Sequence, residues 1–287
     1  MKILITGYKG MLGSDLVETL KDENKHELIL TDIDDLDIAN FNQVDEFLKK
    51  EKPELIINVA AYTDVDGCET NRDLAFNVNS IGPKNLAIVS NEINAKLLHI
   101  STDYVFSGDS LKPYNEDDET GPKSYYGETK LQAELFIKKN TDNYFIIRTA
   151  WLYGFNGKNF VKTMLQLAKT NDKIRVVNDQ HGSPTFTKDL AIAISELIKT
   201  DKYGIYHVTN SDNCTWYDFA KQIFELADIN INVVPVTTEE YPTPAKRPEY
   251  SVLSNEKWES TGFISLRSYK DALKNYMELE LSSNDRD

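Results

Sequence analysis

The residues that point most directly to chemistry are Tyr126 and Lys130, which lie four positions apart in a segment with a helical pattern that continues to residue 137. Residues four apart share one face of a helix, so the phenol and the ammonium can enter the same pocket. A cation beside a phenol favours the phenolate and lowers a phenol pKa that starts near ~10. The spacing therefore predicts a proton donor and acceptor for an alcohol or ketone, with a lowered phenol pKa.

A glycine-rich loop at the start of the chain has the spacing of a nucleotide-binding turn. Gly7, Gly10 and Gly13 follow a short apolar run at residues 2–6 and precede a helical pattern. The spacing is G-x-x-G-x-x-G, whereas the usual dinucleotide fingerprint is G-x-G-x-x-G. Glycines allow a tight turn, close approach of a pyrophosphate, and a helix N-terminus that faces the anion. An ordinary strand-to-helix turn can also carry glycines, but this position between a strand and a helix favours a dinucleotide site.

Two acids follow the second apolar run, which covers residues 28–31. Asp32 lies about twenty residues after the glycines, where a carboxylate can accept hydrogen bonds from the adenosine ribose. Because a carboxylate there repels a 2′-phosphate, its charge favours NADH over NADPH. Asp37 can accept a hydrogen bond from the adenine amino group. Either acid could instead be only a polar loop residue.

A hydroxyl at the end of a strand supplies the context that Tyr126 needs. The predicted strand at residues 97–101 is followed directly by Thr102, upstream of the Tyr126 helix. In a doubly wound sheet this position brings the Thr102 hydroxyl beside the phenol. A second Tyr-x-x-x-Lys pair, Tyr217 and Lys221, has no glycine loop or strand-end hydroxyl arranged before it. We therefore interpret Tyr217 as a structural residue.

Composition narrows the class of protein. The 287 residues are 40% hydrophobic, which is enough for a sizeable core. A formal net charge of −14 argues against general binding to nucleic acid or membrane surfaces, since both need basic fields. Two cysteines provide neither a disulfide framework nor a CxxC metal spacing, and the first apolar run is too short for a signal peptide. A cytoplasmic protein is the simplest expectation.

Strand and helix patterns alternate through the first half of the chain, which predicts an α/β fold with a Rossmann-type doubly wound parallel sheet. Residues 1–150 are expected to form the NAD(P)-binding domain, and a helix and strand from about 187–210 to rejoin it. Residues 151–287 are expected to form mainly a smaller, C-terminal substrate-binding lobe. Residues 75–92 predict a long helix kinked at Gly82 and Pro83, and residues 282–287 a frayed tail.

Seven motifs, in order along nearly the whole chain, resemble those of the extended short-chain dehydrogenase/reductases, most closely the dTDP-4-dehydrorhamnose reductase family. They are the glycine loop, residues 60–66 (AAYTDVD), 101–106 (STDYVF), the Tyr126/Lys130 pair, 148–154 (RTAWLYG), 179–185 (DQHGSPT) and 246–248 (KRP). Each motif is modest alone, and together they are specific.

The resemblance implies an activity in dTDP-rhamnose and cell-surface polysaccharide biosynthesis. It implies NAD(P)H-dependent reduction of the C4 ketone of dTDP-4-dehydro-6-deoxy-L-mannose to dTDP-L-rhamnose. Tyr126 would be the proton donor, Lys130 would stabilise the phenolate and hold the nicotinamide ribose, and Thr102 would bond the ketone oxygen.

The resemblance also assigns binding residues, position by position. The cofactor would contact Gly7, Lys9, Gly10, Met11, Leu12, Gly13, Asp32, Asp37, Ile38, Ala60, Ala61, Tyr62, Thr63, Tyr126 and Lys130. The dTDP-sugar would contact Thr63, Val65, Thr102, Asp103, Tyr104 and Trp151.

Arg247 is a candidate for binding the substrate diphosphate, because so acidic a chain must offer cations locally. Pro248 restricts its backbone, which partly preorganises the guanidinium for a bidentate phosphate contact. Alternatively, residues 246–248 are a basic surface loop, and Trp151 is a core aromatic at the lobe boundary.

Other functions remain open at this point. A nucleotide-sugar 4-epimerase would return the hydride to the same sugar, and a non-catalytic regulatory subunit, like that of methionine adenosyltransferase, would bind cofactor without turnover. Dehydratases of this type carry Glu after the Asp, where this chain has Tyr104. Some relatives bind Mg²⁺ between two subunits; Asp15 and Asp189 lie near the corresponding positions, but without a full ligand set no metal is predicted. A homodimer also stays open.

Overall fold

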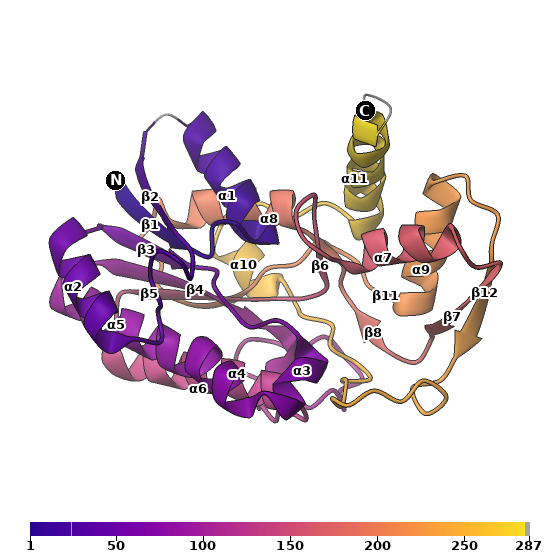
Figure 1. Cartoon of the computed structure of the whole chain (residues 1–287), viewed down its shortest axis with the longest axis horizontal. Coiled ribbons are helices and arrows are strands. Elements are labelled where there is room, and N and C mark those ends of the chain that lie inside the picture. Colours follow the sequence, from indigo (N-terminus) through magenta and orange to yellow (C-terminus); the bar gives the residue numbers. More distant parts are fainter. Residues whose placement is uncertain (24, 285–287) are drawn as a thin grey trace.

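A six-stranded parallel sheet forms the centre of the computed structural model, which describes residues 1–23 and 25–284 (Figure 1). The strands lie in the order β10-β5-β4-β3-β1-β2. Their bounds are β1 Lys2–Thr6, β2 Glu27–Thr31, β3 Leu55–Asn58, β4 Lys96–Thr102, β5 Tyr144–Thr149 and β10 Gly204–His207. The predicted doubly wound α/β fold is confirmed, and β10 pairs with β5 at one edge of the sheet.

Burial on both faces explains why these runs form strands. Ile3, Leu4 and Ile5 in β1 are all 0% exposed. Ile3 and Ile5 belong to one hydrophobic cluster, whereas Leu4 belongs to another on the opposite face. Successive side chains of a strand point to opposite faces, so a strand buried on both sides is a continuous apolar run.

Helices cover the two faces of the sheet (Figure 1). The first cluster includes residues of α1 and α8, and the opposite cluster includes residues of α2, α5 and α6. Their bounds are α1 Met11–Asp22, α2 Phe41–Glu51, α5 Gly82–Glu92, α6 Tyr125–Asn140 and α8 Thr187–Leu197. The chain leaves β1 toward β2 on one side and continues to β3 on the other. This switch point is where open α/β sheets form a ligand crevice, at the carboxyl ends of the strands.

A smaller lobe packs around its own aromatic cluster, on the right of Figure 1. Phe219 and Tyr276 are among its fully buried residues. Its main elements are α7 Phe160–Ala168, β7 Lys173–Val177, α9 Trp216–Leu226, β12 Asn232–Val236 and α11 Tyr269–Asn284. Three two-stranded ladders complete it: β7 with β12, β6 (Leu152–Tyr153) with β9 (Thr185–Phe186), and β8 (His181–Gly182) with β11 (Cys214–Thr215).

A π-helical turn precedes Gly82 and Pro83, the position at which the sequence predicted a kink. Helix α4 (Arg72–Phe76) continues through a π turn at Asn77–Ile81 into α5. Pro83 has no N–H and cannot complete a regular α-helical bond to the preceding turn, so a change of helical register just before it is expected. At the other end of the chain, α11 extends through residue 284, whereas the predicted frayed tail began at 282. Residues 285–287 of that tail lie outside the described residues.

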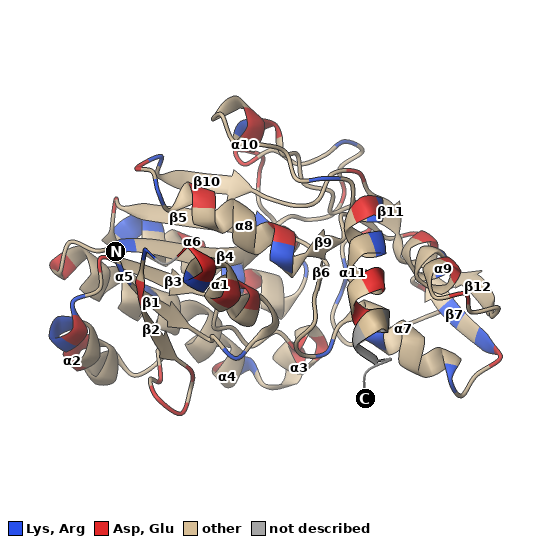
Figure 2. Cartoon of the chain, turned by 90° about the horizontal axis from the view of Figure 1, so that it is seen from above, with Lys and Arg blue, Asp and Glu red and all other residues tan. Residues whose placement is uncertain are grey.

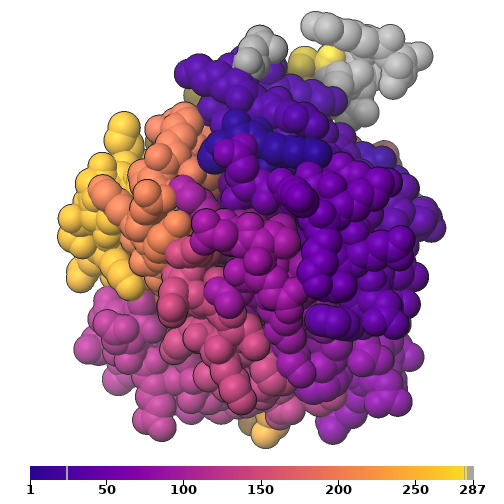
Figure 3. All heavy atoms as spheres, turned by 90° about the vertical axis from the view of Figure 1, so that its left-hand side faces the viewer, coloured from indigo at the N-terminus to yellow at the C-terminus, as the bar shows by residue number. Residues whose placement is uncertain are grey.

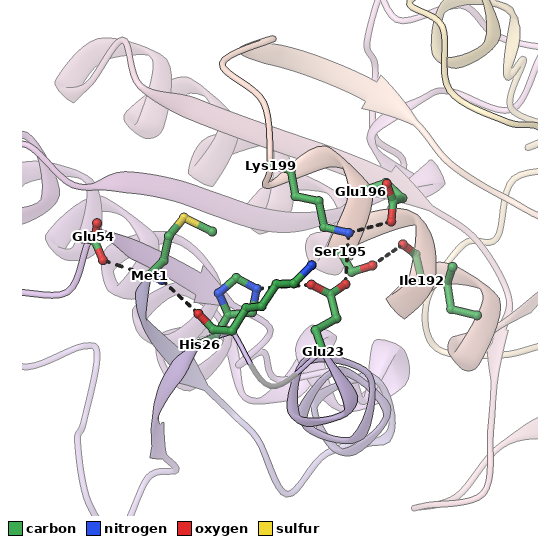
Figure 4. A network of polar contacts seen from close by, with 9 residues as sticks. Met1, Glu23, His26, Glu54, Ile192, Ser195, Glu196 and Lys199 are labelled. Atoms are coloured by element: carbon green, nitrogen blue, oxygen red, sulfur yellow. Dashed lines mark hydrogen bonds and ion pairs between the residues drawn. The ribbon is translucent and has the colours of Figure 1, made fainter.

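Ion pairs join the start of the chain to α8. N-terminal residues and residues near 200 lie side by side on one surface (Figure 3). Figure 4 shows the contacts: Glu23 lies 3.3 Å from His26 Nε2 and 3.1 Å from Lys199 Nζ. Burial raises the pKa of Glu23, but hydrogen bonds from Lys199 and His26 outweigh it and leave that pKa below its usual value. This cluster links the end of α1 to the segment that follows α8.

Residues of both charge signs occur along the ribbon of both lobes (Figure 2). Among the described residues, none of the helices combines the length and apolar character needed to cross a bilayer.

Candidate active site

The structure brings Tyr126, Lys130 and Thr102 together at the carboxyl end of β4. Tyr126 and Lys130 lie in the first turns of α6, and Thr102 is the last residue of β4. Ser124 caps α6 by accepting a hydrogen bond from the Gly127 N–H at 3.2 Å. A Cβ at Gly127 would lie 2.2 Å from the Tyr104 carbonyl oxygen. Glycine is therefore required for α6 to approach the segment that follows β4.

Hydrogen bonds and aromatic contacts orient the phenol. Thr102 hydrogen-bonds the Tyr126 phenol, and its hydroxyl donates to Asp103 Oδ1 at 2.9 Å. The Tyr104 ring meets the Tyr126 ring edge-on, with centroids 5.7 Å apart. Thr102 and Asp103 are both buried, and burial raises the pKa of Asp103 to about 6.

The ionisation of Tyr126 differs from the expectation drawn from spacing alone. Burial raises the phenol pKa and Asp103 raises it further, while the hydrogen bond with Thr102 opposes them. Lys130, whose Nζ donates to the Ile100 carbonyl at 2.6 Å, does not offset the burial. The predicted lowering of the phenol pKa is therefore wrong for the protein alone. A raised phenol pKa keeps Tyr126 protonated at neutral pH, which is the form that can donate a proton.

A buried ion pair behind Lys130 was not anticipated from the sequence. Glu134, on the turn of α6 after Lys130, accepts from Arg148 Nε at 2.9 Å and Nη2 at 2.7 Å. Ser101, next to Thr102, also donates to Glu134. Burial lowers the pKa of Lys130 to about 8, and Glu134 opposes that shift. The spacing 126, 130, 134 continues one helical face and was the available signal for Glu134.

The glycine loop has the close packing that a diphosphate cradle requires. Gly7 has a φ of +73°, and a Cβ there would lie 2.8 Å from the backbone of Ala60. A Cβ at Gly13 would lie 2.3 Å from the Gly7 carbonyl oxygen. Helix α1 starts after Gly10, and no described side chain caps it. Its first N–H groups can therefore face an anion, so the loop fits a dinucleotide.

The other residues assigned to the cofactor lie around this loop. Asp32 accepts the Lys9 backbone N–H at 3.3 Å, so its carboxylate borders the glycine loop. The Asp37 carboxylate accepts from the Ala39 N–H at 2.9 Å, and the Ile38 side chain is buried against Gly82. Leu12 is also buried in the core. Ala60 and Ala61 follow β3, and Met11 opens α1 beside Gly154.

The residues assigned to the sugar come from both lobes. Thr63 is exposed and Val65 opens α3 (Val65–Thr70). Trp151 has a φ of +47° and stacks on Trp216 with ring centroids 3.4 Å apart. It is only partly buried and lies against Gly182, where the lobes meet.

Arg247 is already paired with a carboxylate, Asp66, that lies far away in the sequence. Its Nη1 and Nη2 donate to Asp66 at 3.0 and 2.8 Å, and the Ala245 N–H donates to Asp66 at 3.0 Å. These bonds hold the irregular arm of residues 237–250 against α3. Arg247 lines a pocket of about 290 Å³, together with Lys123 and Lys246.

The remaining candidates lie elsewhere. Tyr217 packs on α9 in the smaller lobe, with Lys221 Nζ 5.4 Å from its ring centroid. Asp189 is paired with Arg267 at 2.8 Å, and Asp15 is buried. The described part of the chain contains no group of three or more His, Cys, Asp and Glu side chains that could hold a metal ion.

Residues 1–281 match the model of the RmlD substrate binding domain family. The chain belongs to this family. It is 44% identical to a spore coat polysaccharide biosynthesis protein, SpsK, of Bacillus subtilis, over 99% of both chains. Among solved structures it is similar to a dTDP-4-dehydrorhamnose reductase from Clostridium acetobutylicum, with 49% identity, a TM-score of 0.96 and coverage of 98% of this chain and 100% of that one. The dTDP-4-dehydrorhamnose reductase of Bacillus anthracis, solved in complex with NADP, is 44% identical with a TM-score of 0.93, over 96% and 98% of the chains. The family resemblance inferred from the motifs is confirmed.

Proposed function

We propose that the protein is an NAD(P)H-dependent dTDP-4-dehydrorhamnose reductase that converts the C4 ketone of dTDP-4-dehydro-6-deoxy-L-mannose to the alcohol of dTDP-L-rhamnose. The observation that carries the proposal is the grouping of Tyr126, Lys130 and Thr102 at the end of β4. It occurs in a chain 49% identical to a solved reductase of that name.

The cofactor site follows from the glycine loop. A bound nicotinamide cofactor supplies the hydride that the ketone carbon receives. Gly7, Gly10 and Gly13, with the N-terminus of α1, would hold its diphosphate, and Asp32 its adenosine ribose. Because Asp32 is anionic, NADH is expected to serve at least as well as NADPH.

Tyr126 supplies the proton. As the ketone carbon is reduced, negative charge grows on the oxygen, and the protonated phenol donates to it. The Thr102 hydroxyl, already bonded to the phenol, holds that oxygen in place. The Lys130 ammonium, the nearest fixed cation on α6, stabilises the phenolate that remains.

Substrate binding is assigned to the smaller lobe, which residues 151–287 mainly form, together with the loops after β3 and β4. Trp151 and Tyr104 would offer apolar surface for the sugar or base, and Asp103, which accepts from Thr102, would line the same site. Arg247 would contact the diphosphate. Because Arg247 is paired with Asp66, the diphosphate must either bind the guanidinium beside Asp66 or displace Asp66 from it.

The test is oxidation of NADH or NADPH on addition of dTDP-4-dehydro-6-deoxy-L-mannose, with the product identified by mass spectrometry. A reductase consumes cofactor and substrate in equal amounts. An epimerase would convert the sugar with no net oxidation of cofactor, and a regulatory subunit would bind cofactor without any turnover. Either of these two outcomes would refute the proposed function.

A further inference from the structure

A chain of buried polar groups connects Lys130 to the first strand of the sheet. The Thr6 hydroxyl donates to Asn58 Oδ1 at 2.7 Å, and Asn58 Nδ2 lies 3.0 Å from His99 Nδ1. His99 Nε2 in turn lies 3.3 Å from Lys130 Nζ. Each of these four residues is at most 2% exposed. This series of polar contacts runs across β1, β3 and β4 to α6, directly beneath the site.

The direction of these hydrogen bonds defines the His99 tautomer. Asn58 Nδ2 can only donate, so His99 Nδ1 must accept, and a neutral imidazole then carries its proton on Nε2. An Nε2–H facing Lys130 can donate to an uncharged amine. It cannot pair with an ammonium, which has no acceptor. The observed arrangement therefore suits Lys130 as the amine.

The same groups can serve the ammonium if every bond reverses. The ammonium then donates to His99 Nε2, and His99 Nδ1–H donates to Asn58 once the amide has turned over. The Thr6 hydroxyl then accepts a hydrogen bond from the Asn58 amide, which rotation of the hydroxyl permits. On passing from the ammonium arrangement to the amine arrangement, the Lys130–His99 pair loses one proton to solvent, and His99 is neutral in both. Burial and the nearby Lys130 hold the pKa of His99 well below its usual value, which favours a neutral ring.

We propose that His99 is a positioning residue that holds the Lys130 nitrogen in both of its protonation states, by reversing its hydrogen bonds with Asn58 and Thr6. The proposal rests on the proposed function, in which Lys130 stabilises the Tyr126 phenolate. It extends that function by naming the groups that keep Lys130 in place while the enzyme regains its proton.

Other ionisable groups face Lys130 and would share in its titration. Tyr126 and Glu134 lie on the same helix, and Glu134 is neutralised by Arg148 from β5. The Ile100 carbonyl of β4 accepts from Lys130 in either state, because both the amine and the ammonium can donate.

Nuclear magnetic resonance tests the proposal without substrate or cofactor. Protein with ¹⁵N-labelled histidine rings and ¹³Cε-labelled lysines is titrated, and the Lys130 and His99 signals are assigned by their loss in Lys130→Met and His99→Gln. We expect the His99 proton to move from Nε2 to Nδ1 as the pH falls, at the same midpoint as the Lys130 titration, with the ring still neutral. A single His99 tautomer throughout, or a ring that becomes charged at that midpoint, would overturn the proposal.

His207 is an internal control in the same spectra, since it is also fully buried. Its Nδ1 lies 3.0 Å from the Tyr114 carbonyl, which can only accept, and its Nε2 lies 3.4 Å from Arg148 Nη1. His207 is therefore locked with its proton on Nδ1. It should show no tautomer change over the range in which His99 switches.

Steady-state kinetics provide a second test of the role of His99. His99→Phe should lower kcat at least ~10-fold and displace its pH profile, because a small misplacement of Lys130 is costly. His99→Gln, whose amide can donate or accept, should recover part of the loss and restore the profile. His207→Phe should leave the profile of kcat unchanged even if it lowers stability. An unaltered profile in a folded His99→Phe variant counts against His99, whereas a wild type without reductase activity counts against the proposed function alone.

Discussion

At the scale of single residues, the protonation of Tyr126 is decided by its surroundings. Burial and Asp103 favour the neutral phenol, and Thr102 supplies the hydrogen bond that moderates them. The protein without ligands thus holds its proton donor in the donating form. The cationic partner, Lys130, is itself buried, and burial lowers its pKa to about 8.

Replacing Tyr126 by Phe should lower kcat at least ~100-fold, because general acid catalysis contributes about that much or more. Affinity for NADH should stay nearly unchanged, because the lost hydroxyl acts on the ketone oxygen. Tyr217→Phe is the matched control, with the same change in the same Tyr-x-x-x-Lys spacing, and should keep turnover within a few-fold. Steady-state kinetics and NADH titration measure both. Greater loss in Tyr217→Phe would contradict the site assignment.

The charge of Asp32 should determine cofactor choice. Asp32→Ala should shift the ratio of NADPH to NADH affinity several-fold toward NADPH, since two unit charges ~4 Å apart interact by about 1 kcal/mol even in bulk water. Binding titrations of wild type and variant with both cofactors measure that ratio. Asp34→Ala, a neighbouring acid that pairs with Lys9 Nζ, is the control for a general loss of negative charge. A wild type with strong preference for NADPH would refute the argument.

At the scale of elements, a buried ion pair holds helix α6 against strand β5. Glu134 on α6 forms a bidentate pair with Arg148 on β5, and both side chains are at most 3% exposed. Since Ser101 also donates to Glu134, the same contact fixes the end of β4 where Thr102 lies. The ion pair thereby sets the distance between the two elements that carry the catalytic hydroxyls.

Glu134→Gln should destabilise the protein by about 3–5 kcal/mol, because it leaves the buried Arg148 charge without its partner. Glu134→Leu combined with Arg148→Met removes both charges and should recover much of that loss. Urea denaturation of the single and double variants measures the free energy of unfolding. Equal destabilisation in the two would show that packing, not the unpaired charge, is responsible.

The arm of residues 237–250 is linked to α3 through Asp66 and Arg247. If Arg247 contacts the diphosphate, Arg247→Ala should raise KM for the dTDP-sugar roughly 10-fold, the effect of losing a charged hydrogen bond. NADH affinity should be unchanged. Asp66→Ala breaks the same pair but keeps the cation, so its KM should not rise. A rise of equal size in both variants would mean that only the link between the arm and α3 matters.

At the scale of the whole molecule, buried titratable groups couple stability to pH. His207 is buried beside Arg148, and burial lowers its pKa from 6.5 to about 3. A group whose pKa is lowered in the folded state takes up its proton more readily when unfolded. Its contribution to stability is therefore complete above pH 6.5 and is lost progressively as the pH falls toward 3.

His207→Gln should accordingly flatten the decline of stability between pH 6.5 and 3. Burial raises the pKa of Asp103 and acts in the opposite sense over part of this range, so the comparison must be variant against wild type. Denaturant unfolding at a series of pH values provides it. A decline equally steep in the variant would exclude His207 as a source of acid sensitivity.

Much of this architecture is determined by local features of the chain. The continuous apolar run of β1, the glycines at 7, 10 and 13, and the strand and helix alternation were sufficient to predict the doubly wound sheet. The spacing of Tyr126 and Lys130, with Thr102 at a strand end, indicated the site and its chemistry. These features are local because strand burial, tight turns and helical faces depend on residues close in sequence.

Only the tertiary structure decided the electrostatics of the site. The partner of Arg247 is Asp66, 181 residues away, and His99 meets Lys130 across 31 residues. Burial, which reverses the expected shift of the Tyr126 pKa, also depends on every element packed around the phenol. Charge interactions and desolvation depend on distance in space and on the exclusion of water, and neither quantity is encoded in the spacing of a motif.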